Sequence, residues 1–127
     1  MPILKEIMTG EVFTTPSEAP VSQVAGSMLK GRFGSAIVME GKRLSGIFTE
    51  RDVLRAAASG ADLTSSPVSE WMTNDPVTVD ADMDADDATE LMMSNGFRHL
   101  PVLDGQTLIG IVSLRDILRT RIRRPQP

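Results

Sequence analysis

One heptapeptide occurs twice in this chain of 127 residues, and the register between its two copies extends over nearly the whole sequence. The segment 46–52 reads GIFTERD and the segment 110–116 reads GIVSLRD. A shift of about 64 residues aligns the halves without a gap and also pairs Met8 with Met72 and Phe33 with Phe97. The chain is therefore an internal duplication, and both halves are expected to adopt the same fold.

The hydrophobic pattern of each half predicts the order β-α-β-β-α. A short β-prone stretch at 12–14 or 77–79 is followed by a predicted helix with an apolar stripe, two apolar strands joined by a Gly-containing turn, and a second helix. In the first half these elements are expected at 21–29, 36–39, 44–48 and 50–58. In the second half they are expected at 85–94, 99–103, 107–112 and 114 to about 123. The fold class is thus a mixed α/β (α+β) structure.

The composition excludes several classes of function. A net charge of −4 and a pI near 4.9 argue against sequence-independent binding to nucleic acid, which needs clustered Lys and Arg. No apolar stretch reaches the roughly 20 residues that span a bilayer, and the start of the chain lacks the apolar core of a secretory signal. With no cysteine, the sequence favours a cytoplasmic protein without disulfides.

The C-terminus is a basic exception on an acidic chain. Arginine stands at positions 115, 119, 121, 123 and 124, before the final Pro-Gln-Pro. Cations at a helix C-terminus suit the negative end of the helix dipole, which is one interpretation of this segment. The alternative interpretation is a contact with a phosphate group or with a partner.

A hydroxyl and a carboxylate recur at the predicted start of the last helix in each half. Thr49 and Asp52 are three residues apart, as are Ser113 and Asp116. Free backbone N–H groups and the helix dipole favour an anion there, and a carboxylate suits the two hydroxyls of a ribose. The same spacing is also that of a capping box, although the usual partner there is the longer Glu or Gln. Spacing alone leaves a nucleotide clamp and a helix cap equally open.

No pattern for metal binding or catalysis stands out. The acidic run 80–87 superficially resembles a calcium loop, but Ala85 stands where Gly is needed and Leu91 where a bidentate Glu is needed. Acids before a helix are instead expected to stabilise its dipole. The sequence has no phosphate-binding loop ending in Gly-Lys-Ser/Thr, no cysteine and a single histidine. No catalytic residue, no metal site and no required cofactor are predicted, and an enzyme is not expected.

The doubled pattern resembles the cystathionine-β-synthase-type (CBS) domain family. The resemblance rests on the Met-Thr start of each half, the run GFRHLPVLDG from 96 to 105, and the repeated GIxxxRD segment. It implies tandem repeats packed as a pseudo-twofold pair, with clefts that bind adenosine compounds such as AMP, ADP, ATP or S-adenosylmethionine. It also implies that the chain forms a homodimer.

The resemblance assigns roles to particular residues. Asp52 and Asp116 match the ribose-binding aspartates of the family, and Thr49 and Ser113 match its phosphate-side hydroxyls. The remaining candidates are Thr14 and Thr78 near the adenine, and Arg98 and His99 near the phosphates. Arg51 and Arg115 can either help to hold phosphates or simply face solvent.

The first repeat departs from the second at one pair of these positions. Gly34 and Ser35 stand where the second repeat has Arg98 and His99, so the two sites are expected to differ in charge and in affinity. A structural hydrogen bond is an equally open role for His99.

The expected organisation is a first repeat at 1–60, a linker at 61–67, and a second repeat at 68–127 that includes the basic tail. The expected function is a stand-alone regulatory module that senses an adenine nucleotide or a related adenosine ligand. Its partners would be that small molecule, a second copy of the chain, and a separate enzyme or transporter. The alternative is a dimeric interaction scaffold whose sites stay empty.

Overall fold

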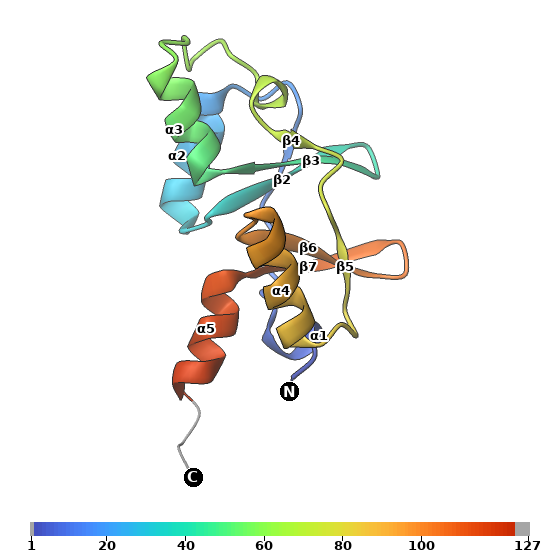
Figure 1. Ribbon diagram of the computed structural model, residues 1–127. Helices are drawn as coiled ribbons and strands as arrows, with labels where there is room; N and C mark the ends of the chain where they lie inside the picture. The colour runs from blue at the N-terminus through green and yellow to red at the C-terminus, as the bar shows by residue number, and fades with distance from the viewer. Residues whose placement is uncertain (1, 124–127) are drawn as a thin grey trace. The chain divides into compact units, whose positions relative to one another are not determined.

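The computed structural model describes residues 2–123, and the β-α-β-β-α order predicted for each half is confirmed (Figure 1). The first half contains β1 (Thr14–Pro16), α2 (Val21–Gly31), β2 (Ser35–Glu40), β3 (Arg43–Thr49) and α3 (Glu50–Ala58). The second half contains β5 (Val79–Asp80), α4 (Ala85–Asn95), β6 (His99–Asp104), β7 (Thr107–Ser113) and α5 (Leu114–Arg123). Short elements precede each half, namely α1 (Leu4–Ile7) in one case and the 3₁₀ helix η1 (Val68–Glu70) with β4 (Thr73–Asn74) in the other.

The chain divides into two compact units that do not coincide with the two sequence repeats. Residues 13–76 form one, here called the first-repeat unit. Within the described chain, residues 2–12 and 77–123 form the other, here called the second-repeat unit. Each unit therefore contains most of one repeat and the short segment that opens the other repeat.

Hydrogen-bonded pairing fixes these exchanged segments. Strand β4, which opens the second repeat in the sequence, pairs antiparallel with β3 of the first, placing Thr73 opposite Ile47. The equivalent Thr9 forms an antiparallel bridge with Ile111 of β7, with N···O distances of 2.9 and 3.0 Å in the two directions. The Met-Thr start of each repeat thus completes the sheet of the other repeat.

The first-repeat unit is a four-stranded sheet with helices on one face. Its strand order is β1-β2-β3-β4, with β1 and β2 parallel and the other pairs antiparallel. Ala36 and Phe48 are cross-strand partners on the face that α2 and α3 cover. The buried cluster of this unit also contains Val21, Val24 and Met28 of α2, Ala56 of α3 and Val68 of η1.

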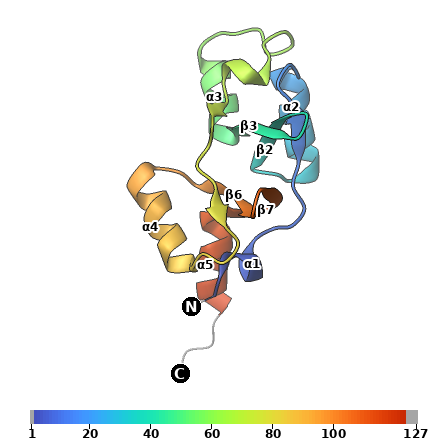
Figure 2. The same cartoon turned by 90° about the vertical axis from the view of Figure 1, so that its right-hand side faces the viewer.

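The second-repeat unit repeats this plan (Figure 2). Its sheet has the order β5-β6-β7, and Leu100 and Val112 are cross-strand partners in its core. The buried cluster also contains Ala85, Ala88 and Met92 of α4, Ile117 of α5 and Leu4 of α1. Leu4 and Val68 are equivalent positions, and each is completely buried in the unit that the other repeat builds.

The segment 61–67, with its linker composition, is hydrogen-bonded to the start of α2. The backbone N–H groups of Val21 and Ser22 donate to the carbonyl oxygens of Ser66 and Leu63, each at 2.9 Å. These bonds satisfy two of the donors that a helix N-terminus leaves unpaired. Asp62 accepts from the Thr64 hydroxyl at 2.6 Å, and this hydrogen bond lowers the pKa of Asp62 below its ordinary value.

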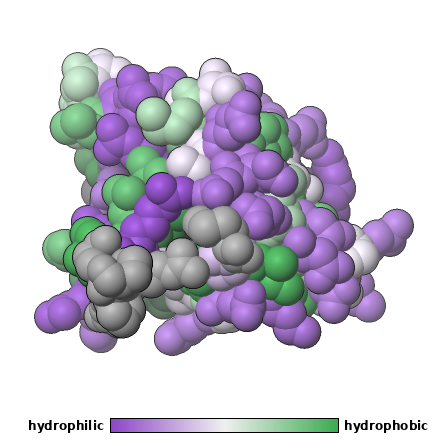
Figure 3. Space-filling view, turned by 60° about the horizontal axis from the view of Figure 1, so that its bottom comes forward, coloured by the Kyte–Doolittle hydropathy of each residue, from purple (hydrophilic) through white to green (hydrophobic). Residues whose placement is uncertain are grey.

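In the face shown in Figure 3, hydrophilic residues predominate and apolar residues form smaller areas between them. Among residues 2–123, no helix has the length and apolar character needed to cross a bilayer.

Candidate ligand-binding sites

The predicted pair in the first repeat lies at the junction between β3 and α3. Thr49 ends the strand and is the N-cap residue of the helix, and Asp52 is the third helical residue. The Thr49 backbone N–H donates to Asp52 Oδ2 at 2.9 Å, and the Thr49 hydroxyl donates to the same oxygen at 3.2 Å. The Asp52 side chain is only 8% exposed, so these bonds lie in a partly desolvated environment.

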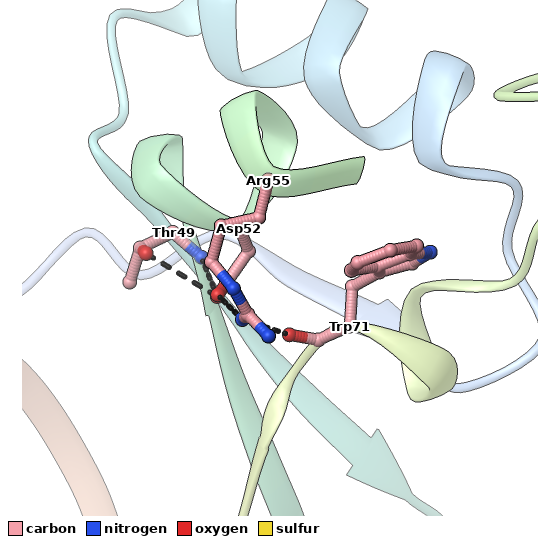
Figure 4. A network of polar contacts seen from close by, with 4 residues as sticks. All are labelled: Thr49, Asp52, Arg55 and Trp71. Atoms are coloured by element: carbon pink, nitrogen blue, oxygen red, sulfur yellow. Dashed lines mark hydrogen bonds and ion pairs between the residues drawn. The ribbon is translucent and has the colours of Figure 1, made fainter. Parts of the chain in front are cut away.

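A third contact uses the other oxygen of the same carboxylate. Arg55 Nη1 lies 2.9 Å from Asp52 Oδ1 and 3.4 Å from the carbonyl oxygen of Trp71 (Figure 4). The guanidinium carbon also lies 5.7 Å from the centroid of the Trp71 ring, within the range of a cation–π contact. Both oxygens of Asp52 therefore have partners inside the protein.

The equivalent pair in the second repeat has a different hydrogen-bond pattern. The Ser113 backbone N–H donates to Asp116 Oδ2 at 2.9 Å, as in the first repeat. Here, however, the Asp116 backbone N–H donates to Ser113 Oγ at 3.0 Å. The Ser113 hydroxyl is thus an acceptor in the cap and keeps its own hydrogen for another partner.

These bonds decide part of the question that spacing left open. Both aspartates accept from the backbone N–H of the cap residue, so the capping interpretation is confirmed for each helix start. Asp is shorter than the usual Glu or Gln, yet its carboxylate reaches the backbone N–H of the cap residue at 2.9 Å in both repeats. Capping uses one carboxylate oxygen and leaves the other for a further interaction.

The two sheets bring positions 34–35 and 98–99 to the helix starts. Ser35 is the cross-strand partner of Thr49, and His99 is the cross-strand partner of Ser113. The carbonyl oxygen of Gly34 accepts from Glu50 N at 3.2 Å, and that of Arg98 accepts from Leu114 N at 2.9 Å. Positions 34–35 and 98–99, whose side chains differ in charge, therefore lie next to the helix starts of the first and the second repeat. The Arg98 side chain is exposed and His99 is half-buried.

The other candidates lie further from the carboxylates. Thr14 opens β1 opposite Ile37, and Thr78 immediately precedes β5; both are exposed. Within residues 2–123 no hydrogen bond connects either threonine to Asp52 or Asp116. Arg51 and Arg115 are exposed in the first turns of α3 and α5, which fits their solvent-facing interpretation. Their proposed roles at a ligand stay predictions.

Sequence reasoning missed Arg55 and the part of Trp71 in this site. The spacing of Asp52 and Arg55, three residues apart on one helix, is a readable signal for a side-chain pair. Trp71 has no such signal, because it reaches α3 only through the exchange of segments between the repeats.

The sequence also predicted roles for the acidic run 80–87 and for the arginines near the C-terminus. Asp84 is the N-cap of α4 and accepts from Asp86 N at 2.8 Å, which confirms its role at the helix start. Asp86 pairs with Arg121 of α5. Among the described residues there is no cluster of three or more His, Asp or Glu side chains able to hold a metal ion. Arg124 and the last three residues lie outside the described part of the chain.

Comparison with known proteins agrees with this architecture. The family model described as "CBS domain" matches residues 4–59 and 68–123. The CBS domain-containing protein YhcV of Bacillus subtilis is 36% identical over 92% of this chain and 84% of its own length.

Solved structures show the same similarity. A putative signal-transduction protein with CBS domains from Burkholderia ambifaria has a TM-score of 0.88 and 30% identity, covering 93% of this chain and 88% of that one. The CBS domain pair of protein MJ0100, solved with 5′-methylthioadenosine and S-adenosylmethionine, has a TM-score of 0.86 and 24% identity, covering 94% and 95%. At that identity it supports the fold alone. Two matched repeats that span most of the residues and carry this fold establish that the chain belongs to the CBS-domain family.

Proposed function

We propose that this protein is a regulatory module that binds an adenosine-containing ligand at the helix starts of α3 and α5. The observation that carries the proposal is the repeated junction at which a hydroxyl residue closes a strand and an aspartate lies in the first helical turn. The carboxylate accepts from ribose hydroxyls, and the hydroxyl and helix N-terminus favour a phosphate or carboxylate group of the ligand.

The chemistry of the neighbouring residues supports a nucleotide in the second repeat. Arg98 supplies a cation close to the start of α5, and Ser113 retains a hydroxyl hydrogen that can be donated to an anion. The CBS domain pair of MJ0100, which was solved with two adenosine compounds, shows only that a protein of this fold can hold that ligand class. The candidates are AMP, ADP, ATP and S-adenosylmethionine.

The proposed role is regulation of another molecule. The chemistry that the two helix starts support is recognition of a ribose by the carboxylate and of an anion by the hydroxyl and the helix N-terminus. The target we propose is a separate enzyme or transporter in the cytoplasm, whose activity depends on the liganded state of the module.

Calorimetric titration with each candidate ligand tests this function. Binding should be weakened at least tenfold at the corresponding site by Asp52→Ala or Asp116→Ala, because each removes the acceptor for the ribose. Asp87→Ala is the matched control, since Asp87 occupies the same third helical position in α4 and is exposed. Failure of every adenosine compound to bind would contradict the proposal, as would equal losses in the Asp87 control.

A second candidate, the interaction scaffold, is favoured by apolar side chains exposed at equivalent positions. Leu29 and Met93 are 84% and 71% exposed, and Leu54 and Leu118 are 70% and 48% exposed. Both pairs differ by the shift that relates the repeats. A scaffold would retain its partner in a pull-down when both Asp52 and Asp116 are replaced, whereas a ligand-dependent regulator would lose it.

A further inference from the structure

The two candidate sites differ in what already occupies their carboxylates. In the first repeat, Asp52 Oδ2 accepts from the backbone and hydroxyl of Thr49, and Oδ1 accepts from Arg55 (Figure 4). The Asp52 side chain is 8% exposed and the Arg55 side chain 56% exposed, so Arg55 lies on the solvent side of this ion pair. A ribose that approaches Asp52 must compete with a cation that is already bound.

Trp71 explains why Arg55 is held in this position. Its carbonyl oxygen accepts a second hydrogen bond from Arg55 Nη1, and its ring lies beneath the guanidinium. A long arginine side chain loses rotamer freedom when it is fixed, and these two contacts offset that cost. The arrangement therefore depends on an aromatic residue supplied by the segment that opens the second repeat.

The second repeat has the arginine but lacks the aromatic residue. Arg119 and Ile7 stand at the positions equivalent to Arg55 and Trp71, and Ile7 belongs to the second-repeat unit as Trp71 belongs to the first. Among residues 2–123, Asp116 takes part in no ion pair, and its Oδ1 has no hydrogen-bond donor. Arg119 is exposed. The acceptor that a ribose needs is thus open at Asp116 and occupied at Asp52.

We propose that Arg55 is a specificity-determining residue that closes the first site and makes the Asp116 site the one filled first. This inference rests on the proposed function and adds the order of filling and its cause. An uncharged adenosine ligand binds Asp52 only after the ion pair with Arg55 opens. The expected penalty is about tenfold in affinity, since one partly exposed ion pair and one cation–π contact are lost.

The first test needs no ligand. Unfolding by urea is measured for Asp52→Asn, Arg55→Gln and the double variant; Asn preserves an acceptor for the cap. We expect the two changes to be non-additive, with a coupling of about fivefold or more in the unfolding equilibrium constant. The matched cycle with Asp116→Asn and Arg119→Gln should be additive. Additivity at Asp52 and Arg55 would overturn the inference.

The second test measures the effect on binding with adenosine, which has the ribose diol and no phosphate for Arg55 to attract. Trp71 is the only tryptophan, so its emission reports on the first site. In an Asp116→Ala background, Arg55→Gln should tighten adenosine binding at this site about tenfold, and Arg119→Gln should leave it unchanged. Unchanged or weaker binding in Arg55→Gln would overturn the inference while leaving the proposed function intact.

The same set of proteins distinguishes a failure of the proposed function from a failure of the role proposed for Arg55. If adenosine, AMP, ADP, ATP and S-adenosylmethionine bind neither repeat of any variant, the proposed function is wrong. Coupling in the ligand-free cycle would then mean that Arg55 and Asp52 form only a structural ion pair, which would also overturn the role of Arg55 in ligand selection. Tight adenosine binding at the Asp116 site of the unaltered protein, together with the gain in Arg55→Gln, is the supporting result.

Discussion

Gly110 lies against the Met8-Thr9 segment so closely that a side chain at this position has no room. A Cβ atom added to Gly110 would lie 2.8 Å from the carbonyl oxygen of Thr9 and 3.1 Å from Met8 Cγ. Gly46 meets Met72 and Thr73 in the same way, with an added Cβ 2.9 Å from the Thr73 carbonyl oxygen. The same close contact therefore occurs in both repeats, and it explains why the repeated heptapeptide begins with glycine in both copies.

Gly110→Ala and Gly46→Ala are each expected to destabilise the protein by about 1–3 kcal/mol, because the neighbouring backbone oxygen must move to admit the methyl group. Urea unfolding measures the effect. Gly26→Ala provides the control, since Gly26 lies within α2 with no atom within 4 Å of an added Cβ. That variant should gain stability, because alanine is the better helix former by about 1 kcal/mol. Equal stability of Gly110→Ala and the unaltered protein would contradict the close contact.

Leu4→Ala tests the exchange of segments. Leu4 is completely buried in the core of the second-repeat unit, so its truncation should cost about 2–5 kcal/mol. Hydrogen exchange should show the loss of protection mainly in β6 and β7. Val68→Ala, the equivalent change, should reduce protection mainly in β2 and β3. If the Leu4 change instead weakened β2 and β3, the assignment of the opening segment to the second-repeat unit would be wrong.

The strands and helices of both repeats were predictable from the sequence. Apolar periodicity changes from the helical to the strand pattern between 29 and 36 and again between 94 and 99, and α3 has the expected bounds of 50–58. The exchange was not predictable for a physical reason. Both opening segments carry Met followed by Thr, so each has the side chain and the backbone groups that fit either glycine, and local chemistry does not choose between Gly46 and Gly110.

The candidate sites were predictable in part. The pairs Thr49 with Asp52 and Ser113 with Asp116 were found from their spacing, and the structure places both at helix starts. The difference between them was not found, because it depends on Trp71, which lies far from Asp52 in the sequence and contacts Arg55 through the exchanged segment. A repeated motif therefore predicted repeated geometry but not repeated occupancy of its carboxylates.

Arg32→Gly is expected to stabilise the first-repeat unit by about 0.5–1 kcal/mol. Arg32 ends α2 in the left-handed conformation with φ 60° and ψ 39°, where residues with a side chain are strained. The equivalent Gly96 ends α4 with φ 72°, a conformation that glycine adopts without this cost. The reciprocal Gly96→Arg change should destabilise by a similar amount in thermal unfolding. A loss of stability in Arg32→Gly would mean that the arginine makes a compensating contact.

The exposed apolar residues at equivalent helix positions predict self-association. Leu54 of α3 and Leu118 of α5 correspond by the repeat shift and leave large side chains in water, which favours their burial against a second copy. Charge also favours a second copy of the chain as the partner, because α2 ends with Lys30 whereas α4 begins with acidic residues. A second copy can therefore place opposite charges together.

Light scattering should give the mass of a dimer for the unaltered protein. The double variant Leu54→Glu with Leu118→Glu should shift it toward the monomer at micromolar concentration, because burying two carboxylates in an apolar contact is costly. Lys42→Glu, an exposed change in the β2–β3 turn, is the control and should leave the mass unchanged. Circular dichroism of each variant separates loss of association from loss of fold. A folded double variant that keeps the dimer mass would place the interface on another surface, and a monomeric unaltered protein would contradict self-association itself.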